Sequence, residues 1–194
     1  MPRRLVLFGT CFIALNESAL AHDVGFAEHV LQPLTALHSL LALLAVGLLN
    51  GQQRKPLRER DIAAMLGLGL TLGLVTTVFV TRLQDQPSFP LALAALAGGL
   101  AALALPLPAP ANSLLVLALG AALGANLSSE TTDWVDRAQT LVGAFVGSGA
   151  TLLGLGALAN QPAKEWWQIG VRVVGSWIFA SAIMVLVLNA HGRL

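Results

Sequence analysis

The chain has 194 residues, of which 56% are hydrophobic and 11% are charged, and its formal net charge is +1. Soluble domains carry about 25% charged residues, so this composition excludes an ordinary water-soluble domain and predicts a membrane protein. The near-zero charge, without a basic tail, gives no indication of nucleic-acid binding. Cys11 is the single cysteine and lies in the predicted signal segment, so we expect no disulfide and no thiolate metal site in the mature protein.

Residues 1–21 have the pattern of a secretory signal peptide. Two arginines form a basic start, an apolar stretch follows over 5–15, and Ala19 and Ala21 supply small residues at a cleavage site. We expect cleavage after Ala21, which leaves His22 as the new N-terminus outside the cytoplasm. The alternative is an uncleaved anchor.

Six apolar runs in residues 22–194 predict a single transmembrane domain. They are continuous Leu, Ala, Gly and Val stretches without the alternation that a membrane barrel needs, so we expect helices. At 1.5 Å rise per residue, runs of about 16–21 residues span or nearly span a hydrocarbon core of about 30 Å. The fold expected is an all-α polytopic membrane bundle of about six transmembrane helices. The predicted spans are 34–49, 62–81, 89–107, 113–127, 138–158 and 169–189.

Lysine and arginine in short loops indicate the orientation of the bundle, because such residues favour the cytoplasmic side. The loop after the first span holds four of them, which are Arg54, Lys55, Arg58 and Arg60. This loop is therefore predicted to lie inside, with the preceding N-terminus outside, in agreement with the signal peptide. We expect a multi-pass protein of the bacterial inner membrane with both termini outside.

Glycines recur four residues apart in three of the spans. Small residues at this spacing let helix backbones approach closely where no hydrophobic force drives association. We expect them to pack helices within the chain, and an intermolecular dimer face is the alternative. The pairs are Gly69 and Gly73, Gly120 and Gly124, and Gly143 and Gly147.

Residues 25–48 read GFAEHVLQPLTALHSLLALLAVGL and resemble the first mature helix of the HupE/UreJ family. These hydrogenase and urease accessory proteins are regarded as nickel permeases of the membrane. The family pattern has a signal ending in Ala-His, then Gly-Phe, then His-Pro-x-x-Gly-x-Asp-His-Leu-Leu-Ala and Val-Gly-Leu. The matching residues here are Ala21, His22, Gly25, Phe26, Pro33, Leu40, Leu41, Ala42, Val46, Gly47 and Leu48.

The first metal motif of that family is altered in this chain. Gln32 stands at the position of the first histidine, and His38 with Ser39 replaces the Asp-His pair. Nickel is well served by imidazole nitrogen, with carboxylate oxygen as a harder partner, in sites of about four to six donors. The changes therefore remove donors that the resemblance would otherwise imply.

The family's second motif, Phe-His-Gly-x-Ala-His-Gly-x-Glu, aligns with residues 118–126. Both histidines are replaced by leucine, at Leu119 and Leu123, and the glutamate is replaced by Asn126. Histidines four residues apart share one helical face and can converge on one ion, whereas leucines cannot bind it. We therefore expect no family-type nickel site.

A replacement site near the outer mouth is the next hypothesis. If a helix begins near Val24, Glu28 and Gln32 share a face, His29 lies one position away, and His22 adds an imidazole and a free amine. The alternative is a solvated amphipathic lead-in, with Pro33 marking a kink or a helix start. If a metal passes, the predicted metal-binding residues are His22, His29, Gln32 and His38 at the mouth and Asn126 in the interior.

His38 lies one turn inside an apolar run, where ionisable residues suggest function. It would act as a proton relay or a weak metal ligand, or it would be a neutral imidazole bonded to a carbonyl, Thr35, Ser39 or Asn126. No motif typical of an enzyme occurs, and no resident cofactor is implied. The resemblance implies a nickel or other divalent-metal permease. The alternatives are a non-transporting membrane scaffold or accessory subunit, and a transporter of a different small solute. The expected partners are the lipid bilayer, a metal ion as substrate, and a membrane partner or a second copy.

Overall fold

The computed structural model describes residues 24–79, 87–127, 134–160 and 165–191. The predicted signal peptide and His22 lie outside these residues. Over the described ranges the chain forms helices and no strands, so the predicted all-α class is confirmed. The helices are α2 (Val24–Thr35), α3 (Leu37–Gln52), α4 (Glu59–Phe79), α5 (Ser88–Ala102), α6 (Ala109–Ala125), α7 (Trp134–Ala159) and α8 (Glu165–His191).

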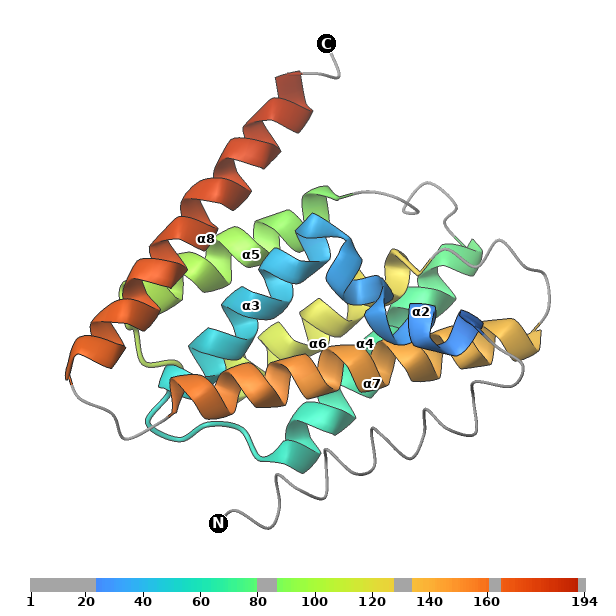
Figure 1. Ribbon diagram of the computed structural model, residues 1–194, viewed down its shortest axis with the longest axis horizontal. Helices are drawn as coiled ribbons and strands as arrows, with labels where there is room; N and C mark the ends of the chain where they lie inside the picture. Colours follow the sequence, from blue (N-terminus) through green and yellow to red (C-terminus); the bar gives the residue numbers. More distant parts are fainter. Residues whose placement is uncertain (1–23, 80–86, 128–133, 161–164, 192–194) are drawn as a thin grey trace.

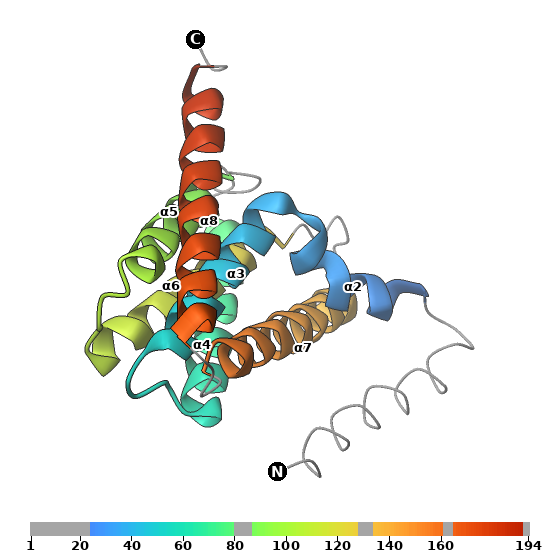
Figure 2. The ribbon, with the colours of Figure 1, turned by 60° about the vertical axis from the view of Figure 1, so that its left-hand side comes forward.

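Successive helices from α3 onward run back and forth between two ends of the molecule (Figure 1). The α3–α4 and α5–α6 connections lie at one end, together with the end of α7 and the start of α8. The α2–α3 bend and the end of α8 lie at the other, and the last turns of α8 stand clear of the body (Figure 2).

Three helices are long and apolar enough to cross a membrane, and up to four if the bent α2–α3 pair forms one span. The three are Glu59–Thr77, Arg137–Ala159 and Trp166–His191. The apolar helices α5 and α6 have 15 and 17 residues. At 1.5 Å per residue such helices reach about 22–26 Å, less than a hydrocarbon core of about 30 Å. By length alone, the described helices thus supply fewer spans than the six predicted.

A sharp bend separates α2 from α3. The two helices meet at 82°, and Ala36 between them has an extended backbone, with φ −81° and ψ 116°. Pro33 lies inside α2 and has no N–H to donate to the carbonyl of His29, which weakens the last turn of α2. The described part of α2 begins at Val24, the first described residue, and the bend lies at Ala36, just after the Pro33 kink that one alternative proposed.

Glycines hold helix backbones in direct contact, as the sequence predicts. Gly69 and Gly73 of α4 face the backbone of α6, and a Cβ added at Gly120 of α6 would lie 2.6 Å from the carbonyl oxygen of Leu66. Gly143 and Gly147 of α7 face the backbone of α2 in the same way. All three predicted glycine pairs therefore pack helices within the chain.

A further close contact, between α5 and α8, was not predicted, because its glycines are not spaced four apart. A Cβ added at Gly98 of α5 would lie 2.9 Å from the carbonyl oxygen of Gly175 of α8. In the reverse direction, a Cβ at Gly175 would lie 3.1 Å from the carbonyl oxygen of Gly98. This contact fixes α8, most of whose other face is exposed.

The substitution Gly147→Ala should destabilise the protein, because the new methyl group would meet the carbonyl of Val30. Overpacking of this kind costs about 1–3 kcal/mol. Gly154→Ala on the same helix is the matched control, since nothing lies within 4 Å of its added Cβ. Thermal unfolding in detergent measures both variants. Equal midpoints for the two would contradict the α2–α7 contact.

The end of α5 forms a Schellman-type cap. The amide of Leu105 donates to the carbonyl of Leu100 at 3.1 Å, and the amide of Ala104 donates to that of Ala101 at 3.1 Å. Such caps need a left-handed residue, which is usually glycine. Here it is Ala104, with φ 49°.

Ala104→Gly should therefore raise the free energy of unfolding, because the left-handed conformation costs a non-glycine residue roughly 1–2 kcal/mol. Ala102→Gly, in the last turn of α5, is the control and should lower it, because glycine disfavours helix. Thermal unfolding midpoints of the two variants test this. A midpoint below the wild type for Ala104→Gly would show that the cap tolerates alanine without strain.

Candidate functional site

A cavity of about 400 Å³ opens at the α2–α3 bend. Its wall comes from the last turn of α2, the first turn of α3, the end of α6 and the residue just before α5. The bend makes the cavity, because it turns the end of one apolar helix and the start of the next toward the same space. The lining residues are Gln32, Pro33, Thr35, Ala36, His38, Ser39, Pro87, Leu123, Asn126 and Leu127.

Three of the five residues predicted to bind metal line this cavity. Gln32 comes from α2, His38 from α3 and Asn126 from the residue that ends α6. Asn126 reaches it because the α4–α6 contact and the loop after Gly124 set the position of that helix end. His38 and Asn126 lie far apart in the sequence, so only the tertiary structure brings them together.

The polar groups of the cavity include one buried acceptor. The Oε1 atom of Gln32 is buried and has no hydrogen-bond partner among the described residues. The Thr35 hydroxyl donates to the Gln32 carbonyl at 2.9 Å, and the Asn126 amide donates to the Ala122 carbonyl at 2.7 Å. A buried acceptor without a partner is costly, so Gln32 would gain a partner if its side chain turned this oxygen toward a cation, a water molecule or a donor group in the cavity.

His29 does not line the cavity. Its Nδ1 lies 3.3 Å from the hydroxyl of Thr140, at the crossing of α2 and α7. This contact gives His29 a packing partner beside Gly143. Whether His22 approaches the cavity is not described, because that residue lies outside the described ranges.

The cavity lining has one imidazole, two carboxamides and two hydroxyls, and it has no carboxylate. In the described part of the chain, no three His, Cys, Asp or Glu side chains gather in a way that could hold a metal ion. Divalent ions in low dielectric need compensating charge or many donors. The arrangement is therefore suited to weak, transient binding or to an uncharged polar solute.

A buried amide cluster at the opposite end of α3 was not predicted. Asn112, 1% exposed, donates from Nδ2 to the Oδ1 of Asn50 at 2.8 Å. The same Oδ1 atom accepts the Leu57 amide at 3.1 Å, which fixes the orientation of both carboxamides. Asn112 falls between the predicted spans 89–107 and 113–127, whereas the structure places this residue in the first turn of α6. An asparagine that follows prolines in an apolar segment is the signal that could have indicated it.

No protein-family model, curated protein or solved structure matches this chain. The functional interpretation therefore depends on the geometry of the cavity and on the sequence resemblance of the first helices. The geometry supplies a site with few donors, set at a broken helix. Broken helices at membrane depth are tolerated where they line a cavity.

If the cavity contains water, a cysteine at Asn126 should react with a hydrophilic maleimide. The variants carry Cys11→Ser and either Asn126→Cys or Ala122→Cys, because Ala122 lies one turn earlier on α6 and is 0% exposed. The thiolate is the reactive form, so a thiol in a dry environment stays unmodified. Mass spectrometry of membrane vesicles reads the labelled fraction. Equal labelling at the two positions would contradict a water-filled cavity.

Proposed function

We propose that this chain is a HupE/UreJ-like integral membrane protein that carries nickel or another divalent metal ion through the cavity at the α2–α3 bend. In this proposal the signal is cleaved, six helices cross the bacterial inner membrane and the N-terminus lies outside. The helices α5 and α6 then cross a locally thinned bilayer, because short hydrophobic segments are accommodated in this way.

The observation that carries the proposal is the position of the altered motif residues. Gln32, His38 and Ser39 align with the first metal motif of the family, and Leu123 and Asn126 align with the second. All five line the one cavity. The cavity thus collects positions of both family motifs from helices far apart in the chain, although Leu119, at the first histidine of the second motif, is buried and does not line it.

Weak donors are compatible with transport. A permeation site must bind well enough for the ion to enter and weakly enough for it to leave. The His38 imidazole is the strongest donor among the lining residues, and the carboxamide oxygens of Gln32 and Asn126 are weaker ones. In the proposed pathway His38 holds the partly hydrated ion while Gln32 replaces one of its water molecules.

The second candidate is transport of a small uncharged polar solute. It is favoured by the lack of carboxylates in the cavity lining and by the buried Oε1 of Gln32. Such an acceptor rewards a donor group of the solute, and an apolar wall with a few polar groups is typical of small-molecule sites. A non-transporting scaffold would keep the packing glycines but would not need the cavity.

Nickel uptake in bacterial cells without their own nickel importers tests the proposal. We expect uptake above the empty vector, and a reduction of about tenfold in His38→Ala, equivalent to about 1.4 kcal/mol of lost binding. His191→Ala is the matched control. That side chain is exposed at the end of α8 and contacts its own helix, so uptake should be unchanged.

Uptake equal to the vector, with the protein present in the membrane, would rule out nickel transport. Labelled uncharged solutes then test the second candidate in the same cells. Co-purification of a stable partner, with no uptake of any solute, would support the scaffold instead. Equal losses in His38→Ala and His191→Ala would show that the cavity is not the pathway.

A further inference from the structure

We propose that the α5–α6 connection, Leu103–Pro108, lies in the hydrocarbon of the bilayer rather than in water. Its ligand is therefore lipid acyl chains. This inference depends on the membrane location in the proposed function but not on transport. It concerns a part of the chain remote from the cavity.

The side chains of this connection are apolar and partly exposed. Its sequence is Leu-Ala-Leu-Pro-Leu-Pro, without a charged or hydrogen-bonding side chain. Leu103 is 71% exposed and Leu105 is 44% exposed. Connections that face water are usually polar, because turns favour Gly, Asn, Asp and Ser. An exposed leucine pair in a turn needs an apolar environment to cover it.

The backbone N–H groups of the connection are all satisfied within the protein or absent. Leu103, Ala104 and Leu105 donate to carbonyls of the last turn of α5. The Leu107 amide donates to Gln53 Oε1 at 2.8 Å. The remaining two residues are Pro106 and Pro108, which have no N–H group.

The pairing of the N–H donors meets one requirement of a lipid environment. Water supplies partners for unpaired amides in an ordinary loop, but hydrocarbon supplies none, and each unpaired group there costs several kcal/mol. The need to pair amides in hydrocarbon also gives a reason for a left-handed alanine at position 104. The cap that this conformation completes pairs the Ala104 and Leu105 amides.

Gln53 sets the depth of the connection. Its side chain is 6% exposed, and its Nε2 also lies 3.5 Å from the Leu105 carbonyl oxygen. The connection therefore lies beside the last residues of α3, directly before the exposed Arg54 and Lys55. Long cationic side chains extend toward lipid phosphates, so Leu103–Pro108 lies just below the phosphate level.

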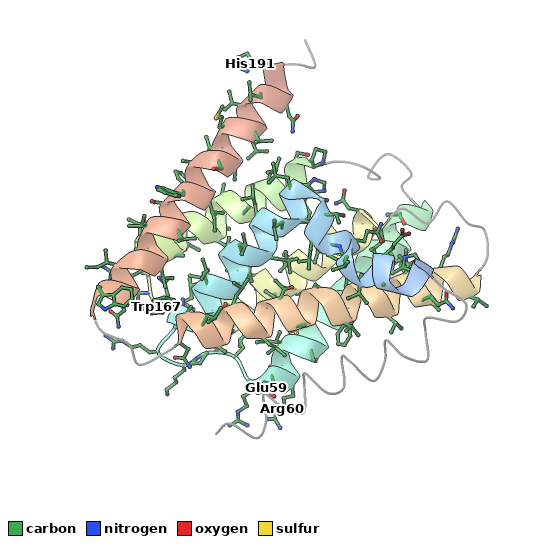
Figure 3. The ribbon with its side chains drawn as sticks, viewed as in Figure 1. Glu59, Arg60, Trp167 and His191 are labelled. Carbon is green, nitrogen blue, oxygen red and sulfur yellow. The ribbon has the colours of Figure 1, made fainter. Side chains whose placement is uncertain are left out.

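The neighbouring α3–α4 connection provides the contrast. It carries Arg54, Lys55 and Arg58, all exposed. Figure 3 labels Glu59 and Arg60 at the start of α4, at this same end of the molecule. At this end, the α3–α4 connection is therefore charged, whereas the α5–α6 connection is apolar. This difference is expected if the first faces the headgroups and water and the second stays in the acyl chains. The short α5 and α6 are then long enough, because their connection does not have to reach the membrane surface.

Spin labels measure this depth directly. Cysteines replace Leu103, Leu105, Lys55 or Met184 singly in a Cys11→Ser chain, reconstituted in vesicles of phosphatidylethanolamine and phosphatidylglycerol. Molecular oxygen concentrates in hydrocarbon, whereas chromium oxalate stays in water. Lys55 is the water reference, and Met184, 65% exposed on α8, is the lipid reference. We expect oxygen to relax the labels at Leu103 and Leu105 more than chromium oxalate does, as at Met184, with the reverse at Lys55.

Other patterns overturn the inference, and they do so in distinguishable ways. If Leu103 and Leu105 behave like Lys55 while Met184 prefers oxygen, the connection lies in water and the membrane location stands. If neither reagent reaches Leu103 and Leu105, protein covers them, as in contact with a second copy. If Met184 also prefers chromium oxalate, the chain does not lie in the bilayer, and the proposed function falls with the inference.

Discussion

Direct contact between helix backbones at glycine is the interaction on which the other features depend. The contact of α4 with α6 through Gly69, Gly73 and Gly120 fixes the end of α6, and with it Asn126. The contact of α7 with α2 through Gly147 fixes the short helix that precedes the bend. The cavity exists because these two contacts hold its walls in place. This close backbone packing adds to a core of fully buried large side chains that includes Leu43, Leu49 and Leu66.

Satisfaction of backbone and amide polar groups is the second constraint, and it is met differently at the two ends of α3. At the cavity end the helix is broken, and the buried oxygen of Gln32 has no partner among the described residues. At the other end, Asn50 accepts hydrogen bonds from Asn112 of α6 and from the Leu57 amide in the α3–α4 connection. Gln53 accepts the Leu107 amide of the α5–α6 connection. The Oε1 of Gln52 and the Oδ1 of Asn112 at that end are also buried without a partner among the described residues, so unpaired acceptors occur at both ends of α3.

Much of the helical architecture was predictable from the sequence because continuous apolar runs and polar breaks are local signals. The all-α class and the packing of the Gly69–Gly73, Gly120–Gly124 and Gly143–Gly147 pairs within the chain agree with expectation. The cavity was predicted only in part. His29 shares a helix with Gln32, but it pairs with Thr140 of α7 instead, because side-chain direction across a helix crossing is not encoded locally.

The sequence by itself determined that the chain is helical and apolar and where most of its helices lie, because these features depend on neighbours along one helix. Only the tertiary structure decided that α2 meets α3 at 82° and that Gln32, His38 and Asn126 line one cavity. It also decided that Gln53 pairs with the connection after α5. These features depend on contacts between distant segments, and a long-range contact is fixed by the packing of whole helices rather than by the residues that make it.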